Sequence, residues 1–247
     1  MLQVQGISME KREVLFNGNE KKIYSTDIPG EILIHFTDII TCYHNVKRAK
    51  IIGKGKVTSQ ISALIFNYLS KHGVPTHFIS QINEREQLCK KVETIPMVVV
   101  ARNRVSGDME RRFRIGEGTK LNDVVIDFYY NVASLGDPLI NDFHAIALNL
   151  VTKEELDEIY SMVRKVHKLL TSLCQKAKLE LVDLQLEFGR DSDGKLIIAD
   201  EISPDTSRFW DAETEKKLDK DRFRHDMSDV LASYKEVLTR LSESLAN

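Results

Sequence analysis

Acidic residues alternate with apolar ones in one stretch of the chain, and this pattern could hold a metal ion. The apolar residues of the stretch are Leu184, Leu186 and Phe188, and the polar ones are Asp183, Gln185 and Glu187. Such alternation predicts a β-strand with one buried face and one polar face. Asp193 and Gly194 then indicate a hairpin turn. The second strand of this hairpin is expected from Leu196 to about Ile202, and it carries Asp200.

The turn places two carboxylates against each other. If Asp193 and Gly194 are the two loop residues, Glu187 lies directly across from Asp200. Opposed Cβ atoms are about 4.5–5.5 Å apart, and like charges placed there destabilise a hairpin. A divalent cation would turn that repulsion into attraction, and Mg²⁺ favours carboxylates together with phosphate oxygens. A three-residue loop would instead shift the register by one and separate the two acids, and a solvated acidic face is the alternative without a metal.

The length and composition of the chain indicate a globular protein. The 247 residues suffice for one large domain or two modest ones, and 42% hydrophobic with 29% charged residues is typical of a globular protein. A net charge of −2 gives no basic field for nucleic acid. Without a secretory signal or an apolar run near the ~20 residues of a membrane span, a cytoplasmic protein with no membrane partner is predicted. The three cysteines are far apart and fit reduced thiols.

The remaining elements follow from periodicity and turn signals. The strands predicted before the central hairpin are residues 14–16, 21–25, 32–36, 87–93, 97–102 and 124–130. A loop is expected from Thr37 to Ile52, and Pro96 is expected to separate two of the strands. Helical spacing predicts helices from about Val57 to Leu69 and from Met227 to about Ser244. Thr152 and Glu155 form a capping box that opens a long helix ending near Lys178.

Several motifs together resemble one enzyme family. The two runs that carry most of the resemblance are Asp183-x-Gln185-Leu186-Glu187-Phe188-Gly189 and Asp200-Glu201-Ile202-Ser203-Pro204-Asp205-x-Ser207-Arg208-x-Trp210-Asp211. Shorter matches are Gly18-Asn19-Glu20-Lys21, Gly53-Lys54-Gly55, the run from Arg102 to Gly107, and the run from Asp137 to Asn141. These runs resemble the SAICAR synthetase (phosphoribosylaminoimidazole-succinocarboxamide synthase) family. The similarity extends from about Met9 to the C-terminus.

The resemblance implies an α+β fold. An N-terminal antiparallel sheet lobe, similar to the small lobe of a protein kinase, would pack on a larger α+β lobe with an ATP cleft between them. Residues 1–8 would be a dispensable N-terminal extension. Residues 9–100 would form the lobe that covers ATP, and residues 101–247 the lobe that binds substrate and metal.

The resemblance also implies an activity in purine biosynthesis. The family is an ATP-dependent ligase that joins L-aspartate to carboxyaminoimidazole ribonucleotide and releases SAICAR, ADP and phosphate. Its implied cofactors are ATP and Mg²⁺, and a homodimer is one open form of assembly. Lys21, Glu187 and Asp200 would be catalytic, Glu187 and Asp200 would hold Mg²⁺, and Gly18 and Lys21 would contact the phosphates. The residues implied to bind the substrate nucleotide are Arg102, Asp183, Ser203, Asp205 and Arg208.

Six positions depart from the family pattern. They are Asn19, Ile39, Val98, Asp108, Asn131 and Gln185. Asn19, Asn131 and Gln185 each stand where the family has a lysine, so positive charge is lost near anionic ligands. Three interpretations therefore stay open: an active synthetase, a nucleotide-binding homologue with reduced or lost activity, and an interaction protein whose acidic hairpin is solvated.

Overall fold

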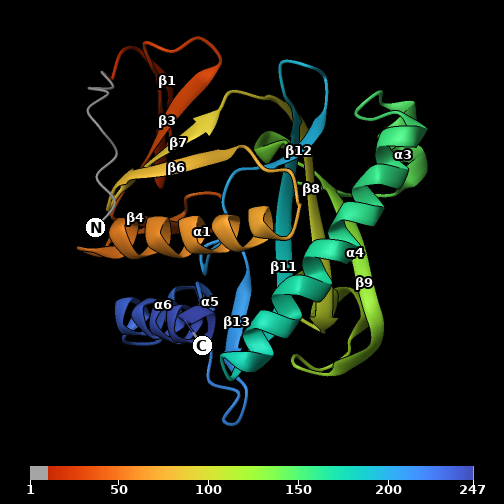
Figure 1. Cartoon of the computed structure of the whole chain (residues 1–247). Helices are drawn as coiled ribbons and strands as arrows, with labels where there is room; N and C mark the ends of the chain where they lie inside the picture. Colours follow the sequence, from red (N-terminus) through yellow and green to blue (C-terminus); the bar gives the residue numbers. More distant parts are fainter. Residues whose placement is uncertain (1–10, 247) are drawn as a thin grey trace.

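Antiparallel sheets form the framework of both lobes (Figure 1). The computed structural model describes residues 11–246, so the expected extension, residues 1–8, lies outside the described residues. The N-terminal lobe is a five-stranded sheet in the order β1-β2-β3-β7-β6. Its strands are β1 (Val14–Asn17), β2 (Lys21–Ser25), β3 (Glu31–Phe36), β6 (Phe78–Asn83) and β7 (Glu86–Lys90). The helix α1 (Lys54–Lys71) packs against this sheet through residues such as Ile61 and Ile65, which are buried.

The segment expected to be a loop contains a hairpin. β4 (Ile39–Cys42) pairs with β5 (Lys47–Lys50), so the expectation of a loop from Thr37 to Ile52 is wrong. The hairpin turn, residues 43–46, has three consecutive residues with positive φ, beginning at Tyr43. Contacts with the other lobe hold it, since the Tyr43 hydroxyl donates to the carbonyl of Arg224 at 3.2 Å and Lys47 pairs with Asp226 at 2.7 Å.

The C-terminal lobe is a sheet in the order β10-β9-β8-β11-β12, to which β13 adds by pairing with β11. Its strands are β8 (Glu93–Arg104), β9 (Lys120–Tyr130), β10 (Leu139–Ile140), β11 (Leu179–Arg190), β12 (Leu196–Ala199) and β13 (Arg208–Asp211). The long helix α4 (Lys153–Lys176) crosses one face of this sheet (Figure 1). The predicted capping box of Thr152 and Glu155 is present at its start. Leu184, Leu186 and Phe188 are buried in the core on that side.

Shorter helices complete the lobe. They are α2 (Asp108–Phe113), the 3₁₀ helix η1 (Ala133–Leu135), α3 (Asp142–Ala147), α5 (Asp221–Arg224) and α6 (Val230–Ala246). α6 packs beside α1, so a helix near the C-terminus contacts the helix that packs on the N-terminal sheet (Figure 1). Among the described residues, no helix is both long enough and apolar enough to cross a membrane. The expected division after residue 100 falls within β8, and this division stays a prediction.

Pro96 lies inside β8, so the expectation that it separates two strands is wrong. The pairing with β11 is interrupted there, because Val98 opposes Glu187 whereas Thr94 already opposes Gly189. Proline donates no backbone hydrogen bond and is tolerated in sheets at such bulges. The bulge therefore accommodates Pro96 within one continuous strand, β8.

Candidate active site

Neighbouring strands bring the expected site residues together on the polar face of the C-terminal sheet. Asp183 pairs with Arg102 across β11 and β8, and Glu187 pairs with Val98. Tyr129 on β9 lies in line with Glu187 and Val98 across the three strands, because it pairs with Val98. These side chains line a cavity of about 280 Å³. The predicted alternation of β11 is confirmed, and it turns the polar residues of this strand toward the cavity and the apolar ones toward α4.

The order of strands along β11 leaves a gap that another segment fills. β12 pairs with the half of β11 that ends at Arg190, whereas β13 pairs with the half that begins at Leu179. Residues 200–207 connect β12 to β13 and lie along the middle of β11, where the Ser207 hydroxyl accepts a hydrogen bond from the backbone of Gln185 at 3.1 Å. The second sequence run of the resemblance is thus held against the first.

The expected hairpin register is wrong by one residue. Glu187 pairs with Ala199, not with Asp200. The Asp191 carboxylate accepts hydrogen bonds from the backbone of Asp193 and Lys195, both at 3.0 Å, and this closes a longer turn than the expected two-residue loop. Asp200 follows the end of β12 and has φ +60°. This left-handed conformation breaks the strand's alternation, so the Asp200 carboxylate still lies close enough to affect the ionisation of Glu187.

Three carboxylates and one lysine form a charged cluster that reaches the cavity through Glu187. Lys21, on β2 of the N-terminal lobe, pairs with Asp200 and lies 3.1 Å from Glu201. Burial alone would lower the pKa of Lys21, but Asp200 and Glu201 outweigh it and the pKa is raised. Burial, followed by the charge of Asp200, raises the pKa of Glu187 to about 8. Burial also raises the pKa of Glu201. The single positive charge of Lys21 therefore does not balance the three carboxylates of this cluster.

This donor set fits a hard divalent cation. The Glu187 carboxylate accepts no hydrogen bond from any residue that the structure describes, and it faces the cavity. Carboxylate oxygens are the protein ligands that Mg²⁺ prefers, together with phosphate oxygens and water. A cation placed between Glu187 and Asp200 would supply the positive charge that Lys21 alone does not supply. Sequence reasoning named Glu187, Asp200 and Lys21, but it gave no role to Glu201, although Glu201 stands next to Asp200 in the quoted run.

Two arginines line the same cavity. Arg102 and Arg208 both donate to the same carboxylate oxygen of Asp183, at 3.1 and 2.6 Å. Asp183 is 1% exposed, and it also accepts from the Ser106 hydroxyl at 2.7 Å. Burial would raise the pKa of Asp183, but Arg208 and Arg102 outweigh it and hold the pKa below its usual value. Asp183 therefore positions both arginines, and its expected contact with the substrate nucleotide stays a prediction.

The chain's own acceptors occupy the Arg102 guanidinium. Besides Asp183, Arg102 donates to Asp108 and to the Tyr129 hydroxyl, both at 3.0 Å, and to Asp127 at 3.2 Å. Sequence reasoning missed Tyr129 and Asp127, which lie at alternate positions of β9 and so reach the same face. Asp108 is held further by Arg112 at 2.9 Å. The aspartate that departs from the family pattern is thus bound to the arginine expected to bind the substrate.

Ser203 and Asp205 lie behind the wall of the cavity. Ser203 is fully buried, where its hydroxyl donates to Glu201 at 2.6 Å and accepts from the backbone of Asp205 at 3.1 Å. Asp205 pairs with Lys54 at 2.5 Å and accepts from the Tyr234 hydroxyl at 2.8 Å. The structure therefore gives these residues contacts that join the site loop to α1 and α6, and their expected contacts with substrate stay predictions.

Gly18 borders a different hollow from Gln185 and Asn131, two of the residues that depart from the family pattern. Gly18 stands in the turn between β1 and β2, where an added Cβ would lie 2.9 Å from the carbonyl oxygen of Lys21, so only glycine fits this turn. It borders a hollow other than the cavity that holds Glu187. Gln185 and Asn131 line the cavity that holds Glu187, so lysines at these two positions, as in the family pattern, would face that cavity.

His77 positions Asp200 from behind. Its Nε2 atom lies 2.9 Å from the backbone carbonyl oxygen of Asp200, and the ring is 2% exposed. Burial lowers the pKa of His77 to about 4, because no carboxylate compensates fully for the loss of water. The neutral imidazole can then donate its Nε2 proton to this carbonyl, which gives His77 a structural role.

Acid is expected to destabilise the protein through His77. The pKa of this side chain is about 4 in the fold against an ordinary 6.5, so its contribution is complete above pH 6.5 and is lost as the pH falls toward 4. Replacing His77 with glutamine, which can still donate to the carbonyl, should remove this dependence. Between pH 7 and pH 5, the wild type should lose about 2 kcal/mol more unfolding free energy than the variant. Urea titrations at both pH values measure this difference, and equal losses would contradict the assignment.

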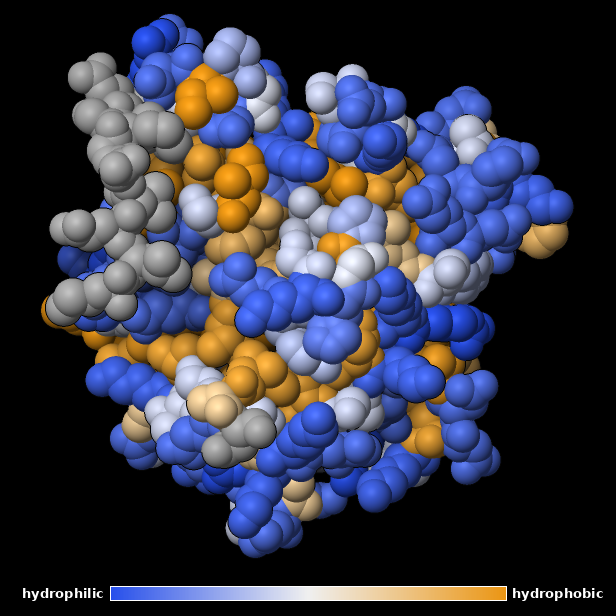
Figure 2. Space-filling model, in the orientation of Figure 1, coloured by the Kyte–Doolittle hydropathy of each residue, from blue (hydrophilic) through white to orange (hydrophobic). Residues whose placement is uncertain are grey.

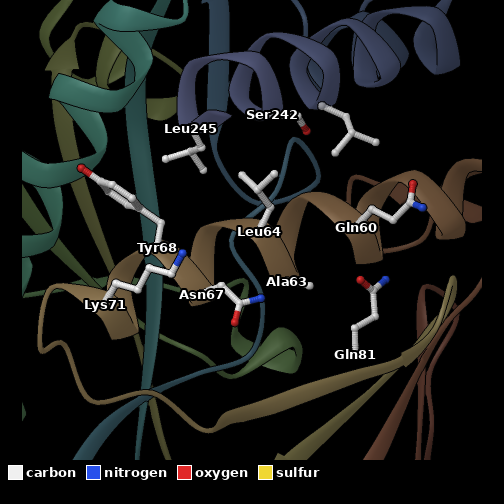
Figure 3. Close-up of a pocket in the computed structure, with 10 residues that line it drawn as sticks. Gln60, Ala63, Leu64, Asn67, Tyr68, Lys71, Gln81, Ser242 and Leu245 are labelled. Atoms are coloured by element: carbon white, nitrogen blue, oxygen red, sulfur yellow. The ribbon is translucent and has the colours of Figure 1, made fainter. Parts of the chain in front are cut away.

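Another cavity, of about 510 Å³, lies between α1 and α6 (Figure 3). Leu64, Tyr68 and Leu245 face it together with amide side chains such as Gln60 and Gln81. Figure 2 shows hydrophobic side chains gathered between these two helices. None of the residues expected in the site lines this cavity, so we assign no catalytic role to it.

Comparison with known proteins agrees with the geometry. The family model described as SAICAR synthetase matches residues 14–241. The phosphoribosylaminoimidazole-succinocarboxamide synthase of Clostridium botulinum (strain Alaska E43 / Type E3) is 46% identical over 235 residues, which cover 95% of this chain and all of that protein. The crystal structure of the synthase from Ehrlichia chaffeensis superposes with a TM-score of 0.91 at 40% identity, covering 93% of this chain and 98% of that chain. A SAICAR synthetase solved in complex with ADP gives a TM-score of 0.90 at 38% identity, covering 94% and 98% of the two chains. This chain belongs to the SAICAR synthetase family.

Proposed function

We propose that this chain is an ATP-dependent ligase that joins L-aspartate to carboxyaminoimidazole ribonucleotide and forms SAICAR, ADP and phosphate. The observation that carries the proposal is a cavity lined by Glu187 and by two largely buried arginines, with further charged residues clustered beside Glu187. The acidic cluster consists of Glu187, which lines the cavity, and its neighbours Asp200 and Glu201 with Lys21. Arg102 and Arg208 line the same cavity. The carboxylates suit a nucleotide with its metal ion, and the arginines suit a phosphorylated substrate.

Glu187 and Asp200 would hold Mg²⁺ on the ATP phosphates. The ion would neutralise charge on the phosphates while the γ-phosphoryl group passes to the substrate carboxylate, since such transfer depends mainly on positioning and charge neutralisation. Lys21 would contribute positive charge from the opposite lobe, provided that it exchanges Asp200 for a phosphate oxygen. Its neighbour Lys22 points to the other face of β2, as the alternation predicts, and cannot serve there.

Arg208 and Arg102 would bind anionic groups of the ribonucleotide. The Arg208 guanidinium is held by Asp183 at 2.6 Å and by Asp221 at 2.7 Å, so its plane is fixed. The substrate carboxylate would attack the γ-phosphorus of ATP, release ADP and become an acyl phosphate. The amine of L-aspartate would then attack the carbonyl carbon, expel inorganic phosphate, lose a proton and form the amide. A homodimer and a cytoplasmic location remain predictions that this site does not test.

The experiment that tests the function is a coupled assay of ADP release with all three substrates. We expect ADP release that depends on both L-aspartate and the ribonucleotide, and formation of SAICAR in the same mixture. Calorimetric titration with Mg-ATP accompanies the assay. Nucleotide binding without ADP release would favour the homologue of reduced activity, and no binding at all would favour the interaction protein.

One observation favours reduced activity as the second candidate. Each guanidinium nitrogen of Arg102 already donates to an acceptor of the chain, and Asp108 is one of them. An incoming phosphate would have to displace Asp108 from Arg102 and also face its negative charge. A serine at this position could donate to phosphate, whereas an ionised aspartate can only accept.

Asp108→Ser is expected to tighten binding of the ribonucleotide. Removal of a like charge near 4 Å is worth about 1–4 kcal/mol, so the dissociation constant should fall at least about fivefold. Titration of both proteins at one pH and salt concentration measures this change. Asp157→Ser, an exposed aspartate of α4, is the matched control and should bind as the wild type does. Equal or weaker binding by Asp108→Ser would show that phosphate does not approach this residue.

A further inference from the structure

A second charged hollow, of about 670 Å³, opens on the outer face of the N-terminal sheet. Its lining includes Lys22 on β2, Arg48 and Lys50 on β5, and Arg85 in the turn between β6 and β7. These four cations come from three separate segments of the chain. Their convergence on one hollow does not follow from a single run of basic residues, so the fold itself gathers them.

Strand alternation separates this hollow from the cavity that holds Glu187. Lys21 and Lys22 are neighbours on β2, and the first pairs with Asp200 while the second faces the outer hollow. Lys22 pairs across the sheet with His35, which lines the same hollow. On β5, Lys47 contacts the C-terminal lobe, whereas Arg48 is exposed on the opposite side.

The positive charge of this hollow is poorly neutralised. Its one lining carboxylate, Asp38, binds Arg85 at 2.7 and 3.0 Å and is therefore already paired. Lys22, Arg48 and Lys50 form no ion pair or side-chain hydrogen bond with any residue between positions 11 and 246. The four cations and the one carboxylate give the lysine, arginine and aspartate side chains of the lining a formal net charge of +3. A concave surface of one sign concentrates ions of the opposite sign.

We propose that this hollow is a binding site for a polyphosphate chain, separate from the cavity that holds Glu187. The volume of about 670 Å³ lies within the range of small-molecule sites. A chain of several phosphates can contact Lys22, Arg48 and Lys50 together, whereas one phosphate neutralises only part of the charge. Arg48 offers a fork of donors that matches phosphate oxygens, and the two lysines act as point charges. Tyr24 adds an aromatic side chain to the lining.

The test is calorimetric titration with inorganic tripolyphosphate, without divalent metal and at low salt. The wild type should bind, and Arg48→Gln/Lys50→Gln should bind at least about tenfold more weakly. Both positions are exposed, so the double variant should melt as the wild type does. The matched control is Lys153→Gln/Lys168→Gln, which removes two exposed charges from α4 in the other lobe and should keep the wild-type affinity.

Three outcomes would overturn the proposal. One is equal affinity of the wild type and the Arg48/Lys50 variant, and another is an equal loss in the α4 control, which would show a general effect of net charge. The third is binding of inorganic phosphate as tight as that of tripolyphosphate, since the site would then recognise one anion only. Metal-free ATP in the same titrations distinguishes the phosphate chain of a nucleotide from a free polyphosphate. Because neither Arg48 nor Lys50 lines the cavity that holds Glu187, failure of this site would leave the proposed ligase activity intact.

Discussion

Glu187→Gln is expected to lower ADP release and Mg-ATP affinity by at least about a hundredfold, since loss of partners that merely orient metal ligands already costs 10–100-fold. Glutamine keeps the size of the side chain and one oxygen but carries no charge. The site would then depend on Asp200 and Glu201, both of which already face Lys21. The coupled assay and Mg-ATP titration measure both losses.

The same substitution should leave the protein at least as stable as the wild type. Burial and the charge of Asp200 raise the pKa of Glu187 to about 8, so ionising this group in the folded protein costs free energy. For an acid whose pKa is raised by folding, stability is lost as the pH rises from its ordinary value of 4.5 toward 8. The neutral amide removes that cost, and the unfolding free energy of the variant at pH 8 should match or exceed the wild type's.

Glu180→Gln is the matched control for this prediction. Glu180 lies on the same strand, β11, but pairs with Arg104 at 3.1 Å at the other end of the sheet. Its replacement should leave ADP release and Mg-ATP affinity within about twofold, because surface ion pairs contribute about 0–1 kcal/mol. A Glu187 variant that binds Mg-ATP normally would remove this carboxylate from the metal site. A variant that unfolds would show that its charge supports the fold.

The hairpin shows which part of this site the sequence could predict. Alternation around Glu187 predicted both the strand and its polar face, because a period of two fixes which residues share a face. The register was wrong, because it depends on the turn, where the Asp191 side chain captures two backbone N–H groups. Asp200 nevertheless lies near Glu187 because its φ is +60°, and a backbone conformation of this kind in a non-glycine residue cannot be read from periodicity.

The contacts of the two arginines show a second limit of prediction from the sequence. The family resemblance identified Arg102, Arg208 and Asp183, and the structure brings these three together. The resemblance could not show that Asp108 and Tyr129 also accept hydrogen bonds from Arg102, since these contacts depend on the pairing between β8 and β9. Long-range contacts of this type follow from strand order, which local patterns do not encode. The strands β4 and β5 were missed for a related reason, as their turn contains no glycine or proline.

The buried pair of Lys54 and Asp205 should have the largest effect on stability. Both side chains are 1% exposed, and the ammonium lies 2.5 Å from the carboxylate. Burial would raise the pKa of Asp205, but Lys54 and then Lys220 outweigh it and lower the pKa to about 2. For an acid whose pKa is lowered, the stability is present above the ordinary 3.8 and is lost as the pH falls toward 2. The pair thus stabilises the contact between α1 and the site loop at neutral pH.

Lys54→Met is therefore expected to lower the unfolding free energy by about 3–5 kcal/mol, because it leaves a buried carboxylate without its cation. Adding Asp205→Asn should recover part of this loss, since a neutral amide can still accept from Tyr234. Lys56→Met, on the same helix, breaks an exposed pair with Glu84 and should cost less than about 1 kcal/mol. Urea titrations at pH 7 measure all four proteins. If Lys54→Met instead proved as stable as Lys56→Met while ribonucleotide binding was lost, Asp205 would be a substrate ligand, as the sequence predicts, and not a structural partner of Lys54.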